Sequence, residues 1–125
     1  MGSIGKFAFY GTLRVGMTNF TAFQDGLRYI KTISLSGFRM FSRGSYPYVI
    51  RTSNEGEVIV VELFEICDLS TMKQINALEE EAGYTTDNVL INGEKFGIYI
   101  FEQNIVGDPV VVGGDWAAYV DENRF

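Results

Sequence analysis

Short stretches that alternate between apolar and polar residues, or are apolar throughout, recur along this chain and predict a protein rich in β-strands. A first strand is expected from Lys6 to Tyr10. The alternation from Arg28 to Met40 predicts a second strand, bent at Gly37, and Tyr46 to Ile50 leads into a third. Val58 to Ile66 is apolar almost without interruption, which is typical of a strand inside a sheet.

Turn and capping signals place the remaining elements. Asn92-Gly93 predicts a two-residue hairpin turn between strands at Tyr84 to Ile91 and Lys95 to Phe101. One long helix is expected from Asp68 to Glu81, capped by Asp68 or Ser70 and ended by Gly83. Shorter helical segments are expected after Thr18 or Asn19, either of which is a suitable cap, and near residues 113–119. The pattern predicts the α+β class in a single domain spanning residues 1–125.

The long helix carries a carboxylate on the face that we expect to be buried. At about 100° per residue, the apolar side chains of the helix share one arc, into which Glu79 also falls. The arc consists of Met72, Ile75, Leu78 and Ala82. Burial of a carboxylate costs several kcal/mol unless the group is paired or protonated. Glu79 is therefore a structural acceptor, bonded to Tyr84, Arg14 or backbone N–H groups, or a half-exposed residue at a frayed helix end, or a general acid/base with a raised pKa.

The composition of the chain excludes several catalytic mechanisms and classes of partner. The chain of 125 residues contains no histidine and a single cysteine, Cys67. These counts exclude Ser-His-Asp and Cys-His catalysis and a disulfide within one chain, and they argue against most zinc sites. The net charge of -6 makes nucleic acid a poor partner. No segment approaches the roughly 18 apolar residues of a membrane span, and no signal peptide is evident, so we expect a cytoplasmic protein.

The end of the first predicted strand reads Tyr10-Gly11-Thr12-Leu13. Glycine at this point allows a sharp turn and a close approach of a ligand to the backbone. Successive backbone N–H groups in such a turn form a small cup that binds an anion, and Thr12 adds a hydroxyl.

These motifs together resemble the gamma-glutamylcyclotransferase-like family, in particular its small AIG2-like and YtfP-like single-domain members. The resemblance covers nearly the whole chain. It is carried by the Tyr10 to Leu13 loop, the Tyr46-Pro47 pair, the end of the long helix at residues 75–80, Tyr84 and Asp115-Trp116. The sequence departs from the family pattern at three positions: Asn76 replaces Asp, Glu80 replaces Gly, and Val61 replaces a frequent Gly.

The resemblance implies a small mixed β-barrel with one main helix packed against it. It also implies the cyclisation of a gamma-glutamyl amide to 5-oxoproline with release of an amine or amino acid. Glu79 would be the catalytic acid/base, and Tyr10, Gly11, Thr12, Leu13 and Tyr84 would contact the substrate. The family's reaction needs no cofactor and no metal. The leaving group stays open among amino acids, peptides, a lysine side chain and polyamines.

Two other classes of function fit the same residues. The same pocket in a non-catalytic binding module would capture a small metabolite without turnover. Alternatively, the chain is a homodimeric interaction domain with a vestigial pocket. The short apolar segment Val110 to Val112 is then either an edge or core segment or part of the dimer contact.

Overall fold

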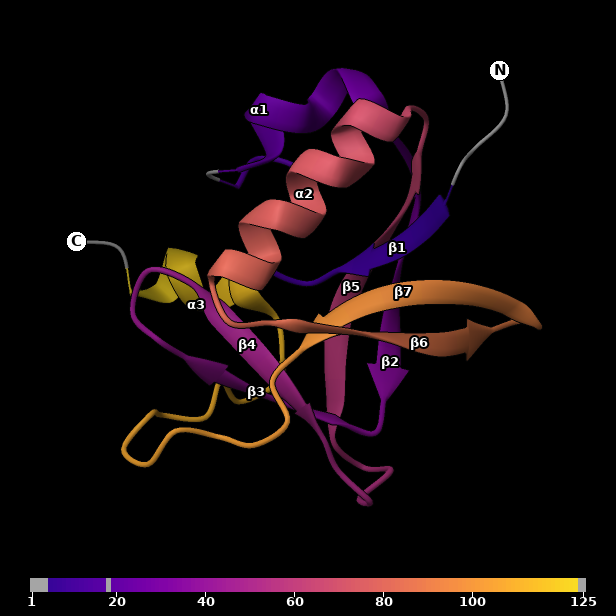
Figure 1. Cartoon of the computed structure of the whole chain (residues 1–125). Coiled ribbons are helices and arrows are strands. Elements are labelled where there is room, and N and C mark those ends of the chain that lie inside the picture. The colour runs from indigo at the N-terminus through magenta and orange to yellow at the C-terminus, as the bar shows by residue number, and fades with distance from the viewer. Residues whose placement is uncertain (1–4, 18, 124–125) are drawn as a thin grey trace.

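The computed structural model describes residues 5–17 and 19–123, which form two β-sheets and three α-helices (Figure 1). The strands and helices in chain order are β1 (Gly5–Phe9), α1 (Phe20–Phe23), the 3-10 turn η1 (Gln24–Gly26), β2 (Leu27–Ser36), β3 (Phe38–Ser42), β4 (Pro47–Arg51), β5 (Val58–Ile66), α2 (Leu69–Glu81), β6 (Thr85–Ile91), β7 (Glu94–Ile100) and α3 (Trp116–Glu122).

The larger sheet is mixed and has the strand order β2-β5-β1-β7-β6. β1 lies at its centre, antiparallel to β5 and parallel to β7. β3 and β4 form a separate antiparallel pair. The α+β class with a mixed sheet is therefore confirmed, but "barrel" is a loose description, because the larger sheet does not close on itself within the described residues.

The predicted bend at Gly37 is a change of sheet. Gly37 has a φ of 86°, a left-handed conformation that favours glycine. Its N–H donates to Glu57 O at 2.9 Å, while its own carbonyl accepts from Thr52 N. One predicted strand thus becomes β2, at the edge of the larger sheet, and β3, in the smaller sheet.

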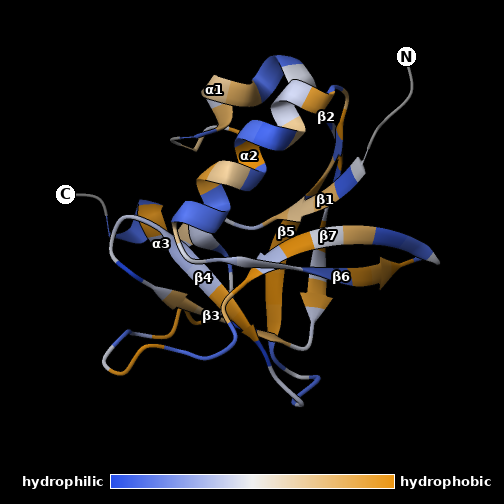
Figure 2. Ribbon diagram, viewed as in Figure 1, coloured by the Kyte–Doolittle hydropathy of each residue, from blue (hydrophilic) through white to orange (hydrophobic). Residues whose placement is uncertain are grey.

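The hydrophobic core lies between the sheets and the helices, where the strands are apolar in Figure 2. β5 is an interior strand with the predicted bounds, and Ile59 and Val61 in it are fully buried. Tyr48 from β4 and Ile98 from β7 are equally inaccessible. Trp116, at the start of α3, is 2% exposed and stacks on Tyr119, so it closes the core.

The capping and turn predictions are largely confirmed. Asp68 caps α2 by accepting from Thr71 N at 2.7 Å, which decides between the two candidate caps. Asn92 and Gly93 have φ angles of 51° and 81° in the hairpin turn. Of the two candidate caps for α1, Asn19 is the N-cap residue, although its side chain makes no capping hydrogen bond. Thr18 lies outside the described residues.

The apolar arc predicted for α2 is only partly buried. Ile75 and Glu79 are buried, as predicted, and Met72 packs against the core. Leu78, however, is 37% exposed, and Ala82 is also exposed. These two side chains border a cavity, described below, instead of filling the core. Among the residues described, no helix is both long and apolar enough to cross a bilayer.

Candidate active site

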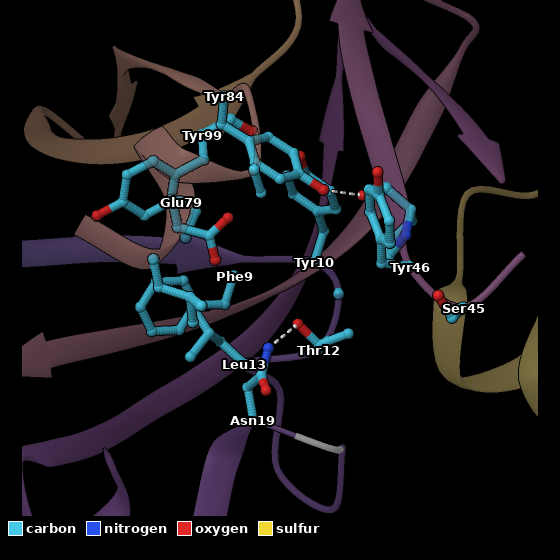
Figure 3. Close-up of a pocket in the computed structure, with 15 residues that line it drawn as sticks. Phe9, Tyr10, Thr12, Leu13, Asn19, Ser45, Tyr46, Glu79, Tyr84 and Tyr99 are labelled. Carbon is cyan, nitrogen blue, oxygen red and sulfur yellow. Dashed lines mark hydrogen bonds between the residues drawn. The ribbon is translucent and has the colours of Figure 1, made fainter. Parts of the chain in front are cut away.

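A cavity of about 300 Å³ lies where the end of β1 faces the last turns of α2 (Figure 3). All six residues predicted to form the site line it: Tyr10, Gly11, Thr12, Leu13, Glu79 and Tyr84. The remaining lining residues are mostly apolar or aromatic and comprise Ala8, Phe9, Asn19, Ser45, Tyr46, Pro47, Leu78, Ala82 and Tyr99. The fold therefore joins the loop after the first strand to the buried face of the long helix, as the sequence predicted.

Among the described residues that line the cavity, Glu79 is the one carboxylate. Its side chain projects from α2 into the cavity, between Tyr99 and the loop after β1 (Figure 3), and the residue is 9% exposed. Within the described part of the chain, no group donates a hydrogen bond to its carboxylate. Burial disfavours the ionised form and raises the pKa of Glu79 to about 7. Near neutral pH the carboxyl is therefore able both to accept and to donate a proton.

The raised pKa predicts how stability depends on pH. The carboxyl ionises at about pH 4.5 in the unfolded chain and at about 7 in the native protein. Its contribution to the free energy of unfolding is fully present below pH 4.5 and is lost as pH rises through 7. Relative to Glu79→Gln, we expect the wild type to lose about 3 kcal/mol over this interval. Urea denaturation of both proteins between pH 4 and 8 measures the difference. Parallel curves would show that Glu79 ionises normally.

The loop after β1 lines the same cavity through Gly11, Thr12 and Leu13. The carbonyls of Gly11 and Thr12 accept from Arg14 N at 3.0 Å and Asn19 N at 2.9 Å, which fixes the turn. The N–H groups of Gly11, Thr12 and Leu13 donate to no acceptor within the described residues. Gly11 and Leu13 are nevertheless buried, and buried N–H groups are nearly always paired with a protein group, water or a ligand. These three amides are therefore suited to bind an anion.

Gly11 has a structural role besides the close ligand approach that the sequence predicts. It does not have a positive φ, so no left-handed turn requires glycine here. Instead, a Cβ atom at this position would lie 2.7 Å from Pro47 Cγ. The missing side chain thus lets Pro47 pack directly against the loop.

We predict that Gly11→Ala pushes the loop away from Pro47. Such overpacking costs about 1–3 kcal/mol of stability, and displacement of the amides weakens the binding of carboxylate ligands. Thermal unfolding and calorimetric titration with L-5-oxoproline measure both effects. Gly16→Ala, with no atom within 4 Å of the new Cβ but a φ of 82°, controls for backbone strain alone. Unchanged ligand affinity in Gly11→Ala would contradict the role assigned to the loop.

Three tyrosines of the cavity use their hydroxyl groups within the protein. The Tyr10 hydroxyl donates to Tyr99 O at 2.6 Å, and the Tyr84 hydroxyl donates to Pro47 O. The Tyr99 hydroxyl donates to Asn76 Oδ1. Burial, together with the nearby Glu79 carboxylate, raises the pKa of each tyrosine. Tyr84 therefore does not donate to Glu79, contrary to one structural explanation of the buried carboxylate.

Arg14 does not contact Glu79 either. Its guanidinium is bound by two other carboxylates: Nε donates to Glu62 Oε2 at 3.0 Å and Nη1 to Asp115 Oδ1 at 2.9 Å. The second oxygen of Glu62 accepts from Val15 N at 2.8 Å. Asp115 also caps α3 through Ala118 N. We call Arg14, Glu62 and Asp115 the Arg14 network. It fastens the end of the loop to β5 and to α3.

The departures from the family pattern have distinct surroundings. Asn76 binds the Tyr99 hydroxyl beside the cavity, Glu80 is exposed, and Val61 is completely buried in β5.

Sequence reasoning did not assign Asn19, Tyr99 or Ser45 to the site. A signal existed for Asn19, which was expected to cap a helix seven residues after Thr12. Within residues 5–17 and 19–123, no cluster of three or more His, Cys, Asp or Glu side chains is arranged to hold a metal ion.

Comparison with known proteins identifies the family. The gamma-glutamyl cyclotransferase, AIG2-like family matches residues 7–118, and the chain belongs to this family. The resemblance drawn from the sequence is thereby confirmed. Membership favours a gamma-glutamyl cyclotransferase-like activity on a small molecule. No protein with a curated description matches the chain.

Solved structures share the fold at low sequence identity. The uncharacterized protein PH0828 from Pyrococcus horikoshii has a TM-score of 0.78 at 23% identity, covering 94% of each chain. Protein ytfP from Escherichia coli has a TM-score of 0.71 at 19% identity, covering 95% of this chain and 99% of that one. An AIG2-like protein from Mus musculus has a TM-score of 0.74 at 13% identity, covering 92% and 89%.

Proposed function

We propose that this protein converts a gamma-glutamyl amide into 5-oxoproline and a free amine or amino acid. The α-amine of the substrate attacks its own side-chain carbonyl, a five-membered lactam forms, and the amide C–N bond breaks. Both reacting groups belong to the substrate molecule. Holding the substrate in a conformation that brings its amine to its carbonyl therefore supplies much of the reduction in the activation barrier. The observation that supports this proposal best is the shared cavity of the Glu79 carboxyl and the Gly11–Leu13 amides.

Glu79 would transfer the protons of this reaction. In its ionised form it removes a proton from the substrate's α-ammonium, which creates the nucleophilic amine. In its protonated form it donates to the leaving nitrogen as the tetrahedral intermediate collapses. The α-ammonium loses two protons in total, and the released amine gains two when it leaves as an ammonium ion. Glu79 ends in its starting state, and its pKa of about 7 suits both roles.

The loop after β1 would bind the α-carboxylate of the substrate. Gly11, Thr12 and Leu13 line the cavity together with Glu79, and their amides would offer successive N–H donors to a ligand there. A carboxylate held there places the neighbouring α-ammonium within the same small cavity as the Glu79 carboxyl. This arrangement explains why a buried acid and an amide-lined turn occur together.

A panel of gamma-glutamyl amides tests the proposal. The panel includes amides of amino acids, alkylamines, a diamine and the lysine side chain, with formation of 5-oxoproline as the readout. We expect turnover of at least one member. Ligand-induced thermal stabilisation without turnover would instead identify a binding module. Absence of both turnover and stabilisation would contradict any role for this cavity in recognising gamma-glutamyl compounds.

A further inference from the structure

Asn19 directs its side chain to Thr12 instead of to the helix that it precedes. Asparagine is a favoured N-cap, but at the N-cap of α1 its side chain makes no capping bond. Its Nδ2 donates to Thr12 Oγ1 at 2.9 Å, as Figure 3 shows, and its backbone N–H donates to Thr12 O at 2.9 Å. Both oxygens of Thr12 therefore accept hydrogen bonds from the same residue.

This pairing leaves the proton of the Thr12 hydroxyl for another partner. A hydroxyl carries one O–H donor and two acceptor lone pairs. One lone pair is occupied by Asn19, and within the described residues the O–H has no protein acceptor. Thr12 and Asn19 both line the cavity that contains Glu79. A ligand acceptor in the cavity is thus in a position to receive this proton.

We propose that Asn19 is a positioning residue that holds the Thr12 hydroxyl as a fourth donor for the substrate's α-carboxylate. The other three donors are the amides of Gly11, Thr12 and Leu13, and a carboxylate has about four lone-pair sites to receive them. The inference rests on the proposed function and extends it. It assigns a role to a residue outside the Tyr10 to Leu13 motif and gives a direction to the Thr12 hydroxyl.

The test uses L-5-oxoproline, a ligand that carries the same carboxylate and does not react further. Calorimetry measures its dissociation constant for variants at both positions. Thr12→Val, which keeps the shape and removes the hydroxyl, should weaken binding about tenfold, in line with loss of one hydrogen bond to a charged group. Thr12→Ser should stay within threefold of the wild type. With a reacting substrate, Thr12→Val should raise KM and leave kcat unchanged.

A double-mutant cycle separates positioning from general structural damage. Asn19→Leu should weaken binding three- to tenfold when Thr12 is present and less than twofold in a Thr12→Val background. Melting temperatures establish that all variants fold. An equal loss from Asn19→Leu in both backgrounds, or unchanged affinity in Thr12→Val, would overturn the inference.

The outcomes also separate this inference from the proposed reaction. Weaker ligand binding in Thr12→Val, without turnover of any gamma-glutamyl amide by the wild type, would retain the inference and remove the reaction. Turnover by the wild type with an unaltered KM in Thr12→Val would retain the proposed reaction and remove the inference about Thr12 and Asn19. If the wild type neither binds L-5-oxoproline nor turns over any amide, both fail.

Discussion

Glu79→Gln is expected to fold normally and to lose catalytic turnover by about a thousandfold, within the 10²–10⁴ range typical of a general acid/base. Glutamine has nearly the same shape and neither accepts nor donates a proton at neutral pH. No hydrogen bond within the described residues depends on the carboxylate, so removal of its charge leaves no partner group unpaired. The rate of 5-oxoproline formation at saturating substrate, measured with the most reactive amide of the panel, is the readout.

Glu80→Gln is the matched control for this prediction. It makes the same chemical change on the next residue of α2, where the side chain is exposed. We expect its kcat to stay within a few-fold of the wild type. Equal losses in the two variants would mean that the negative charge of the helix end matters and that Glu79 has no individual role. Unfolding of Glu79→Gln at neutral pH would identify the carboxylate as structural.

Arg14→Met should cost about 3–5 kcal/mol of stability, because it leaves a buried charge without its partner. The side chains of Arg14 and Glu62 are only 8% and 10% exposed, so Glu62 would be left without its partner in a poorly solvated place. The variant also detaches the loop from Asp115. Denaturant unfolding at pH 7 measures the loss. The double variant Arg14→Met/Glu62→Leu should regain most of the lost stability, because neither the guanidinium nor the Glu62 carboxylate is then left buried without a partner.

Arg28→Met provides the comparison for an exposed pair. Arg28 binds Glu65 between neighbouring strands, but its side chain is 65% exposed. Exposed pairs contribute about 0–1 kcal/mol, so this substitution should be nearly neutral. A loss below 1 kcal/mol in Arg14→Met would show that the Arg14 network is no stronger than a surface pair, and its assigned role in fixing the loop would be wrong.

Local patterns of the sequence predicted the elements and the centre of the site. The continuous apolar run of β5, the Asp68 cap and the Asn92-Gly93 turn each depend on neighbouring residues, and all three are as expected. The position of Glu79 on the buried side of α2 followed from helical periodicity alone. These features could be predicted because the physics that determines them acts within a few residues.

Contacts between distant segments were beyond the reach of such patterns. Periodicity did not reveal that Arg14 would bind Glu62 and Asp115, nor that the Tyr84 hydroxyl would donate to Pro47 O. Leu78 was assigned to the core because an apolar helix position usually packs there, whereas here it borders a cavity. The need for glycine at position 11 likewise comes from a residue of another element, Pro47.

The central place of β1 has a consequence for the order in which the molecule forms. Its neighbours in the larger sheet are β5, from the middle of the chain, and β7, from a late part of it, and the Tyr10 hydroxyl donates to a carbonyl 89 positions further on. Closing so large a loop is entropically costly, and such long-range pairing slows folding. During synthesis, the first strand cannot gain its parallel neighbour β7 until most of the polypeptide has left the ribosome. Nascent chains shorter than this should therefore have no affinity for a gamma-glutamyl compound, however well their early segments are structured.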